Sequence, residues 1–256
     1  MLEERPFTRL VWQKDRMLLH GIVFRLEHYR NDEWELGEEC FRFYKIKELV
    51  DQYEAFWKLR QGLHPKNIFE LGIWDGGSVA FWFECLRPQK HVAIDIHEKQ
   101  DSPYFQRYVA TRGLADRIKN YWGVDQSNGA LLREIVSREF DKPLDMVLDD
   151  ASHLYQPTRS SFETLFPLLR PGGLYIIEDW AWEHWPGFVT PGHVWFHETS
   201  LTKLICELVE ATGSAIRLIS NLTVFGGFAV IERGEMPTEE FRDFNLEAHI
   251  TRRPKA

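Results

Sequence analysis

The sequence is short of cysteine, of positive charge and of long apolar runs. Three of its 256 residues are cysteines, Cys40, Cys85 and Cys206, and their wide spacing and odd number provide neither a disulfide framework nor a metal knuckle. Lys and Arg number 31 against 39 Asp and Glu, so the net charge of −8 lacks the basic excess of a non-specific nucleic-acid binder. No stretch approaches the ~18 consecutive apolar residues of a transmembrane helix. We therefore expect neither nucleic acid nor membrane among its partners.

Signals for secretion and for disorder are also missing. The N-terminal residues MLEERPFTRL are charged from the third position and lack the apolar core of a signal peptide. Together with the few cysteines, this predicts a protein of the reducing cytoplasm. With 44% hydrophobic residues and 10 Trp, the chain can bury a sizeable core, which excludes a disordered chain. Its length predicts one large domain, or a domain with an appendage.

Short apolar runs alternate with longer amphipathic segments over most of the chain. We expect strands at 67–72, 91–96, 119–124, 144–150 and 174–180, and helices at 77–86, 102–113, 128–139 and 158–169. This alternation predicts an α/β fold with a mostly parallel sheet and helices on both faces. After a further helix near 200–212, the runs IRLISN and FGGFAVIER follow each other too closely for a crossover helix, so they must pair antiparallel.

The N-terminal part lacks this alternation. A broken apolar run, LLHGIVFRL (18–26), and the acidic, aromatic stretch NDEWELGEE (31–39) indicate a strand or arm outside the main fold. From Phe41 the apolar residues recur at helical spacing as far as Gly62, which predicts a helix leading into the core. We therefore expect an N-terminal arm, residues 1–40, and a main domain, residues 41–256.

A glycine-containing loop follows the first strand of the main domain. It reads ELGIWDGGS from Glu70 to Ser78, with Gly72 and Gly76 spaced G-x-x-x-G. Such a turn lies at the carboxyl ends of the strands, where open α/β sheets bind ligands, and glycine lets the backbone approach a ligand closely. Since the spacing is not the G-x-G-x-x-G of dinucleotide sites and a Walker-type G-K-[ST] is absent from the sequence, a phosphate ligand is disfavoured.

Acidic residues follow the next two strands. Asp95 closes the second strand, where a carboxylate can accept hydrogen bonds from both hydroxyls of a ribose. Asp125 follows the third strand and is interpreted either as a contact for an adenine amino group or as a cap before Asn128. The glycine loop alone could serve turn geometry only, but Asp95 at the next strand end favours a binding role.

These motifs together resemble a class I S-adenosylmethionine-dependent methyltransferase. The resemblance is carried by FELGIWDGGS, AIDI, LDMVLDDASH, LLRPGGLYIIEDW and the antiparallel last strands, and it spans residues 65–232. Within the superfamily, DDASH followed by EDW is similar to the magnesium-dependent sugar O-methyltransferases of the macrocin and mycinamicin type, whose relatives are often labelled cephalosporin hydroxylases. The resemblance implies a Rossmann-like, doubly wound sheet of seven strands with an antiparallel final strand.

The resemblance also implies roles for individual residues. The S-adenosylmethionine site would comprise Glu70, Gly72, Gly76, Ser78, Asp95, Asp125 and Asp150. The Mg²⁺ ligands would be Asp150, Glu178 and Asp179, and the general base would be His153. Asp149 receives no role from the resemblance and is interpreted as a residue that caps or braces the turn.

The chemistry of the acidic residues agrees with such an ion. Neighbouring parallel strands lie ~4.8 Å apart, so carboxylates at their matching ends can converge on one ion. Hard oxygen ligands suit Mg²⁺, whereas an ordinary zinc site needs more than one histidine. An iron site for a hydroxylase would need two His and one carboxylate, which this cluster does not supply. A sugar hydroxyl is a poor nucleophile until it loses its proton, and a metal with a nearby imidazole can promote that loss.

The segment from 181 to 199 concentrates Trp and His directly after the fifth strand. We interpret it equally as a lid over the acceptor, because aromatic faces stack on sugars, or as buried core.

We therefore expect an enzyme that moves a methyl group from S-adenosylmethionine to a hydroxyl of a sugar, in an antibiotic glycoside or a bacterial oligosaccharide. The unmatched arm suggests a dimer contact. Two alternatives stay open: a catechol-type phenolic O-methyltransferase, and a non-catalytic partner subunit that binds the cofactor.

Overall fold

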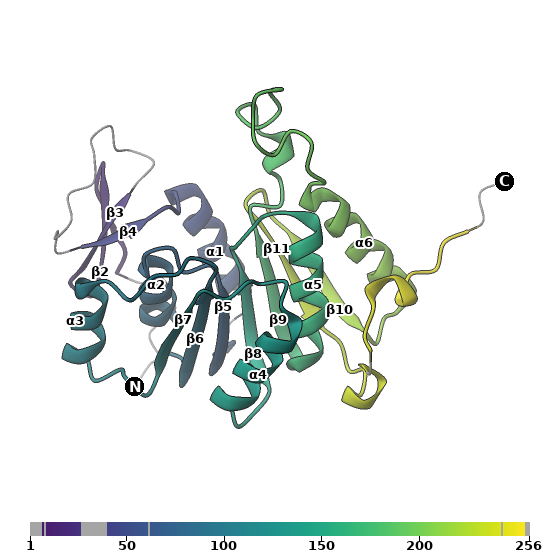
Figure 1. The fold of residues 1–256 in the computed structure, drawn as a ribbon, viewed down its shortest axis with the longest axis horizontal. Helices are drawn as coiled ribbons and strands as arrows, with labels where there is room; N and C mark the ends of the chain where they lie inside the picture. The colour runs from purple at the N-terminus through teal and green to yellow at the C-terminus, as the bar shows by residue number, and fades with distance from the viewer. Residues whose placement is uncertain (1–6, 8, 27–39, 61, 242, 254–256) are drawn as a thin grey trace.

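The computed structural model describes residues 7, 9–26, 40–60, 62–241 and 243–253, which form two sheets and their surrounding helices (Figure 1). The stretch NDEWELGEE, expected to be part of an arm, lies outside the described residues. Within the described residues, no helix combines the length and the apolar character needed to cross a membrane.

The larger sheet is the predicted α/β sheet. In the described part of the chain it has seven strands in the order β10–β11–β9–β8–β5–β6–β7 (Figure 1). They are β5 (Asn67–Leu71), β6 (Lys90–Asp95), β7 (Ile118–Trp122), β8 (Leu144–Asp149), β9 (Leu169–Glu178), β10 (Ile219–Val224) and β11 (Phe228–Arg233). The strands β5 to β9 pair in parallel, while β11 runs antiparallel to both β9 and β10. The predicted fold class is confirmed, including the antiparallel pairing of the last two strands.

Helices cover both faces of this sheet. They are α1 (Lys47–Leu59), α2 (Gly77–Leu86), α3 (Pro103–Thr111), α4 (Gly129–Glu139), α5 (Tyr155–Leu165) and α6 (Leu201–Ser214), with short 3₁₀ turns η2 (Phe166–Leu168), η3 (Trp182–His184), η4 (Thr238–Phe241) and η5 (Leu246–His249). Side chains of α1, α2 and α3 form one core, and those of α4, α5 and α6 form the other. Successive strand residues alternate between the two cores, as Ile68 and Phe69 do, because side chains of a strand point to opposite faces.

The smaller sheet is formed mostly by residues of the predicted arm. Among the described residues it has four strands, β1 (Val11–Trp12), β2 (Arg16–Leu19), β3 (Ile22–Leu26) and β4 (Phe41–Phe43). Strand β4 pairs in parallel with β3, so the helix that we expected from Phe41 was wrong over its first residues; α1 begins only at Lys47. The reason is local, since Phe41 and Phe43 are buried and Arg42 is partly exposed, which is an alternation of period two.

A second boundary differs from the prediction. The helix expected at 158–169 is α5, which begins and ends earlier, and a 3₁₀ turn then leads into β9 at Leu169. Pro167 in that turn has no N–H to continue the α-helical hydrogen bonds, which explains the early end.

The small sheet packs closely on the start of α2. A Cβ added to Gly77 would lie 1.9 Å from the carbonyl oxygen of Arg42, so the backbone of β4 touches the helix there. Beneath this contact Phe24, Phe43 and Phe81 pack ring against ring. The residues that follow β4 are thereby held beside the carboxyl ends of the large sheet.

Candidate active site

A cavity of about 870 Å³ lies at the carboxyl ends of the parallel strands. Its walls come from the segments after β5, β6, β7, β8 and β9 and from the connection between β4 and α1. Of the residues predicted for the site, eight line it: Gly72, Ser78, Asp95, Asp125, Asp150, His153, Glu178 and Asp179. Two of the predicted cofactor residues, Glu70 and Gly76, are not among its lining residues.

The glycines of the loop after β5 have structural reasons of their own. Gly72 has φ +95°, and a Cβ there would lie 2.1 Å from the carbonyl oxygen of Asp150, so the loop backbone touches the turn after β8. Gly76 has φ +87° at the start of α2, and a Cβ there would meet the ring of Phe105 at 2.4 Å. Both positions therefore require glycine for conformation and close packing, whether or not a cofactor is bound.

Asp95 organises the same loop. Its Oδ2 accepts hydrogen bonds from the N–H groups of Ile73 and Trp74, at 2.9 and 2.7 Å, and its Oδ1 accepts one from the N–H of His97 at 2.9 Å. The ring Nδ1 of His97 lies 2.7 Å from the same Oδ1. Burial alone would raise the pKa of Asp95, but these donors outweigh it and the pKa is lowered. The carboxylate at the end of β6 is thus ionised and placed beside the glycine loop.

Asp125 and Glu70 have protein partners. Oδ1 of Asp125 accepts hydrogen bonds from the N–H and the hydroxyl of Ser127, both at 2.7 Å, while the side chain of Asn128 is the N-terminal cap of α4. Glu70 is buried inside the sheet, with Oε2 2.8 Å from Nε2 of His91 on β6. The contact of Asp125 with the adenine stays a prediction. The cofactor-binding role of Glu70 also stays a prediction, and Glu70 does not line the cavity.

The turns after β8 and β9 bring three predicted residues together. Ligand atoms of Asp150, His153 and Asp179 all lie within 4.8 Å of one another. They can meet because β8 and β9 are neighbours in parallel register, with Asp149 opposite Ile177. The two carboxylates fit a divalent cation with further positions left for water or substrate oxygens, and the imidazole lies beside them.

The third predicted Mg²⁺ ligand, Glu178, lies behind this group. Its side chain is only 2% exposed; Oε2 accepts a hydrogen bond from Nζ of Lys45 at 2.5 Å, and Oε1 accepts one from the hydroxyl of Tyr53 at 2.8 Å. Lys45 also donates to Oδ2 of Asp150 at 2.8 Å. Burial alone would lower the pKa of Lys45, but the charges of Asp150 and then Glu178 raise it, so the ammonium persists. A direct contact between Glu178 and an ion stays a prediction.

Sequence reasoning missed Lys45 and Tyr53 as residues of the site. Both belong to the segment 41–59, which was expected to be one helix and nothing more. Their donors reach Glu178 over 133 and 125 residues of sequence. The local sequence FYKIKE does not distinguish a buried lysine from a solvent-exposed one.

Asp149 braces the turn that carries Asp150 and His153. It is buried and accepts hydrogen bonds from Ser161 Oγ, Tyr175 OH and Gln126 Nε2, at 2.7, 2.8 and 3.1 Å. Burial raises its pKa to about 6 against the pull of these donors. Oε1 of Gln126 in turn accepts the N–H of Ser152 at 2.8 Å, which ties the buried acid to the turn.

The aromatic segment between β9 and α6 projects beyond the sheet (Figure 1) and contains both buried and cavity-lining residues. Trp182 is buried, and its Nε1 donates to the carbonyl oxygen of His153 at 2.8 Å. Trp195 packs on Trp182 with ring centroids 5.2 Å apart and lies 5.9 Å from the His153 ring. Trp185, by contrast, lines the cavity. The segment therefore holds the His153 turn and contributes one wall of the cavity.

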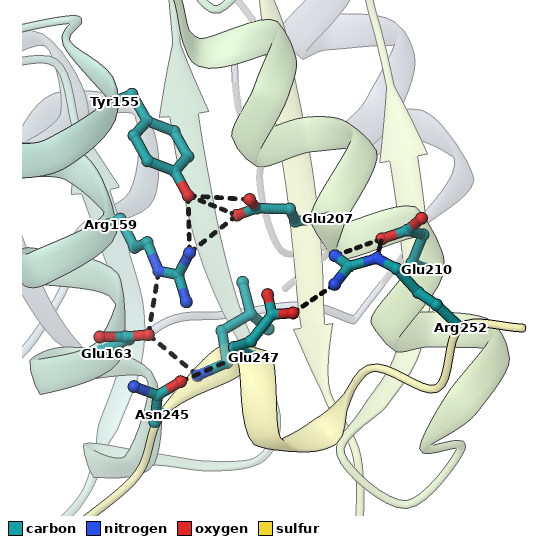
Figure 2. A network of polar contacts seen from close by, with 9 residues as sticks. Tyr155, Arg159, Glu163, Glu207, Glu210, Asn245, Glu247 and Arg252 are labelled. Atoms are coloured by element: carbon teal, nitrogen blue, oxygen red, sulfur yellow. Dashed lines mark hydrogen bonds and ion pairs between the residues drawn. The ribbon is translucent and has the colours of Figure 1, made fainter. Parts of the chain in front are cut away.

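A polar network fixes the helix that begins just after His153 (Figure 2). The hydroxyl of Tyr155 donates to Glu207 of α6 at 2.8 Å, and Nη1 of Arg159 lies 2.6 Å from that hydroxyl. Glu163 joins the same helix to the backbone of η5, and Arg252 pairs with Glu210 of α6 (Figure 2). Tyr155 is engaged in this network and does not line the cavity.

Comparison with known proteins agrees with this architecture. Residues 69–180 match a family model described as a methyltransferase domain. Demethylmacrocin O-methyltransferase from Streptomyces fradiae is 31% identical over 188 residues, which are 66% of this chain and 44% of that protein. Mycinamicin VI 2''-O-methyltransferase from Micromonospora griseorubida is 30% identical over 203 residues, 70% of this chain and 47% of that protein.

A solved structure extends the likeness to the fold. The MycE methyltransferase of mycinamycin biosynthesis, in complex with Mg, SAH and mycinamycin VI, has a TM-score of 0.56 and 28% sequence identity. The match covers 75% of this chain and 51% of that one, so the chain spans about half the length of the proteins it resembles, or less. From its sheet order, its cavity and these matches, we conclude that the chain contains a class I S-adenosylmethionine-dependent methyltransferase domain and resembles the macrocin and mycinamicin type of sugar O-methyltransferases.

Proposed function

We propose that the protein is a Mg²⁺-dependent O-methyltransferase that moves a methyl group from S-adenosylmethionine to a sugar hydroxyl of a small glycoside or oligosaccharide. The observation that carries the proposal is the convergence of Asp150, His153 and Asp179 on the cavity that also holds Gly72 and Asp95. Donor-side and acceptor-side groups therefore share one cavity, which an in-line methyl transfer requires.

The residues after β5 and β6 are suited to the methyl donor. The loop from Gly72 to Ser78 lines the cavity and is held by Asp95, whose lowered pKa keeps the carboxylate ionised at neutral pH. The cavity volume of about 870 Å³ lies within the usual range of small-molecule pockets.

The residues after β8 and β9 are suited to the acceptor. We assign Asp150 and Asp179 to the ion and His153 to the proton of the hydroxyl. When bound there, Mg²⁺ would supply Lewis acidity that lowers the pKa of a sugar hydroxyl. His153 can take up that proton, and its turn is held by the indole of Trp182 and, through Ser152, by Gln126. Glu178, buried on Lys45 and Tyr53, keeps its predicted ligand role only if it leaves these partners.

The relatives support a sugar over a phenol as acceptor. The two curated relatives named above are a demethylmacrocin and a mycinamicin O-methyltransferase, and a third is named L-olivosyl-oleandolide 3-O-methyltransferase. The catechol-type alternative has no such support. A non-catalytic partner subunit is disfavoured because the acids and the imidazole converge as a reaction would need.

The test is a methyl-transfer assay read by mass spectrometry. The protein, with S-adenosylmethionine and either Mg²⁺ or excess EDTA, is given a panel of glycosides and, in parallel, a panel of catechols. We expect a gain of one methyl on a glycoside, in Mg²⁺ only. The His153→Ala variant should be slower by roughly 100-fold to 10,000-fold, the usual contribution of a general base. Methylation of catechols alone, or full activity in EDTA, would overturn the proposal.

A cytoplasmic location and a homodimer are part of the same proposal. Among the described residues, Cys40, Cys85 and Cys206 form no disulfide, which supports a reducing compartment. Light scattering of the purified chain would measure its oligomeric state directly.

A further inference from the structure

An ammonium group occupies the inner side of the proposed metal site. Lys45 lies in the connection between β4 and α1, and its side chain is 5% exposed. Its Nζ is 2.8 Å from Oδ2 of Asp150 and 2.5 Å from Oε2 of Glu178, so it bridges the ends of β8 and β9. The other oxygen of Asp150, Oδ1, is on the side of His153, 3.9 Å from its Nε2. Asp150 is therefore shared between the lysine and the donor set for the ion.

This arrangement has two electrostatic consequences. Without a positive charge from Lys45 or a metal ion, the site would hold three neighbouring carboxylates, those of Asp150, Glu178 and Asp179. The carboxylate of Glu178 is fully buried. A buried carboxylate without a partner is strongly destabilising, so Lys45 stabilises the empty site. A divalent ion beside Asp150 would in turn be repelled by the ammonium on the same carboxylate. Lys45 and the ion thus compete for one negative centre.

A neighbouring lysine shows that burial against acidic side chains is not common to all lysines of this segment. Lys47, two residues later, is 48% exposed and pairs with Asp51 one turn along α1. It does not line the cavity, and such surface pairs contribute little to stability. Lys47 is a matched control for Lys45.

We propose that Lys45 is a positioning residue that holds Asp150 and Glu178 in place while no metal ion is bound. A divalent cation bound at Asp150 and Asp179 takes over part of this role. This inference rests on the metal site of the proposed function. Lys45 and Tyr53 both come from the segment that follows β4, so the position of this strand affects the acceptor side of the cavity.

The experiment compares thermal unfolding of the wild type, Lys45→Met and Lys47→Met, each in EDTA and in Mg²⁺. In EDTA we expect Lys45→Met to unfold on the order of 10 °C lower, from the usual cost of breaking a buried ion pair. Lys47→Met should match the wild type. Mg²⁺ should raise the Tm of Lys45→Met more than that of the wild type, and calorimetry should show about tenfold or more tighter Mg²⁺ binding. A merely structural lysine would not change the affinity for the ion.

A double variant keeps the test decisive if Lys45→Met is unfolded in EDTA. Lys45→Met with Glu178→Gln removes both buried charges, so it should regain most of the lost Tm. Failure of the double variant to regain stability would overturn the proposal. An equal Mg²⁺ response in wild type and Lys45→Met would overturn the role of Lys45 alone. If Mg²⁺ raises the Tm of neither the wild type nor Lys45→Met, the proposed metal site is overturned. The proposal that the ion takes over part of the role of Lys45 then fails with it.

Discussion

At the scale of single residues, the site depends on carboxylates whose neighbours differ although their strand positions are alike. Asp95 and Asp150 both follow parallel strands, yet the first is surrounded by backbone N–H donors and the second by a lysine and a histidine. Backbone donors orient the glycine loop, whereas the side-chain neighbours of Asp150 leave one oxygen on the side where an ion can bind. The same residue type therefore has a donor-side role in one place and an acceptor-side role in the other.

Asp95 gives a prediction about pH. Because hydrogen bonds outweigh burial and lower its pKa below the ordinary 3.8, the ionised carboxylate stabilises the folded state above pH 3.8, and this contribution is lost as the pH falls through the lowered value. Asp95→Asn removes the charge and one acceptor, so urea unfolding at pH 7 should show a loss of about 1–3 kcal/mol. The difference from wild type should shrink below about pH 4. A difference that is constant from pH 7 to pH 3 would contradict this account of the loop.

At the scale of elements, two sheets meet at one helix end. The close approach of β4 to α2 at Gly77 brings residues 42–45 to the cavity, where they line it together with the glycine loop. Strand β4 and the residues directly after it are thus part of the cavity wall. The contact of β4 with α2 is made by backbone atoms, which cannot move aside as a flexible side chain can.

Gly77→Ala tests this contact. Its methyl group would overlap the carbonyl oxygen of Arg42, so β4 or α2 must shift, and we expect a loss of about 1–3 kcal/mol in the free energy of unfolding. The affinity for S-adenosylmethionine should fall as well, because the displaced segments line the cavity.

Gly187→Ala is the control for this variant. Nothing lies within 4 Å of a Cβ at Gly187, so its stability should stay within about 0.5 kcal/mol of the wild type. Equal stability of both glycine variants would show that the small sheet does not need the close contact.

At the scale of the whole molecule, the cavity exists only in the folded chain. Its lining runs from Arg42 to Gly227 and includes residues at or just after the carboxyl end of each strand from β5 to β9. The unfolded chain cannot assemble such a set, so a cofactor binds the folded state alone and stabilises it by mass action.

This predicts a thermal shift by the product of the donor. S-adenosylhomocysteine at about 100 times its Kd should stabilise the fold by about 2.7 kcal/mol. For a domain of this size the Tm should rise by roughly 5–11 °C. ATP and NAD⁺ serve as controls, because the loop lacks the spacing of phosphate-binding motifs. A shift with NAD⁺ and none with S-adenosylhomocysteine would refute the assignment of the cofactor.

The sequence by itself determined the alternation of strands and helices, and with it the edge of the sheet at which the site lies. Apolar periodicity reports the local conformation, and acids at 95, 150 and 179 follow strands whose carboxyl ends must share an edge in a parallel sheet. The family resemblance then supplied the strand order, which periodicity does not contain.

Only the tertiary structure decided which neighbours each acid has. Lys45 reaches Asp150 across 105 residues, and Glu70 is turned into the sheet toward His91 although it belongs to the motif of the loop. Such pairs depend on the order of the strands and on the bends at their ends, where the simple alternation of side chains no longer holds. The same physics explains β4: three residues with period two became a strand because β3 offered them a partner, and no local pattern states which partner will be there.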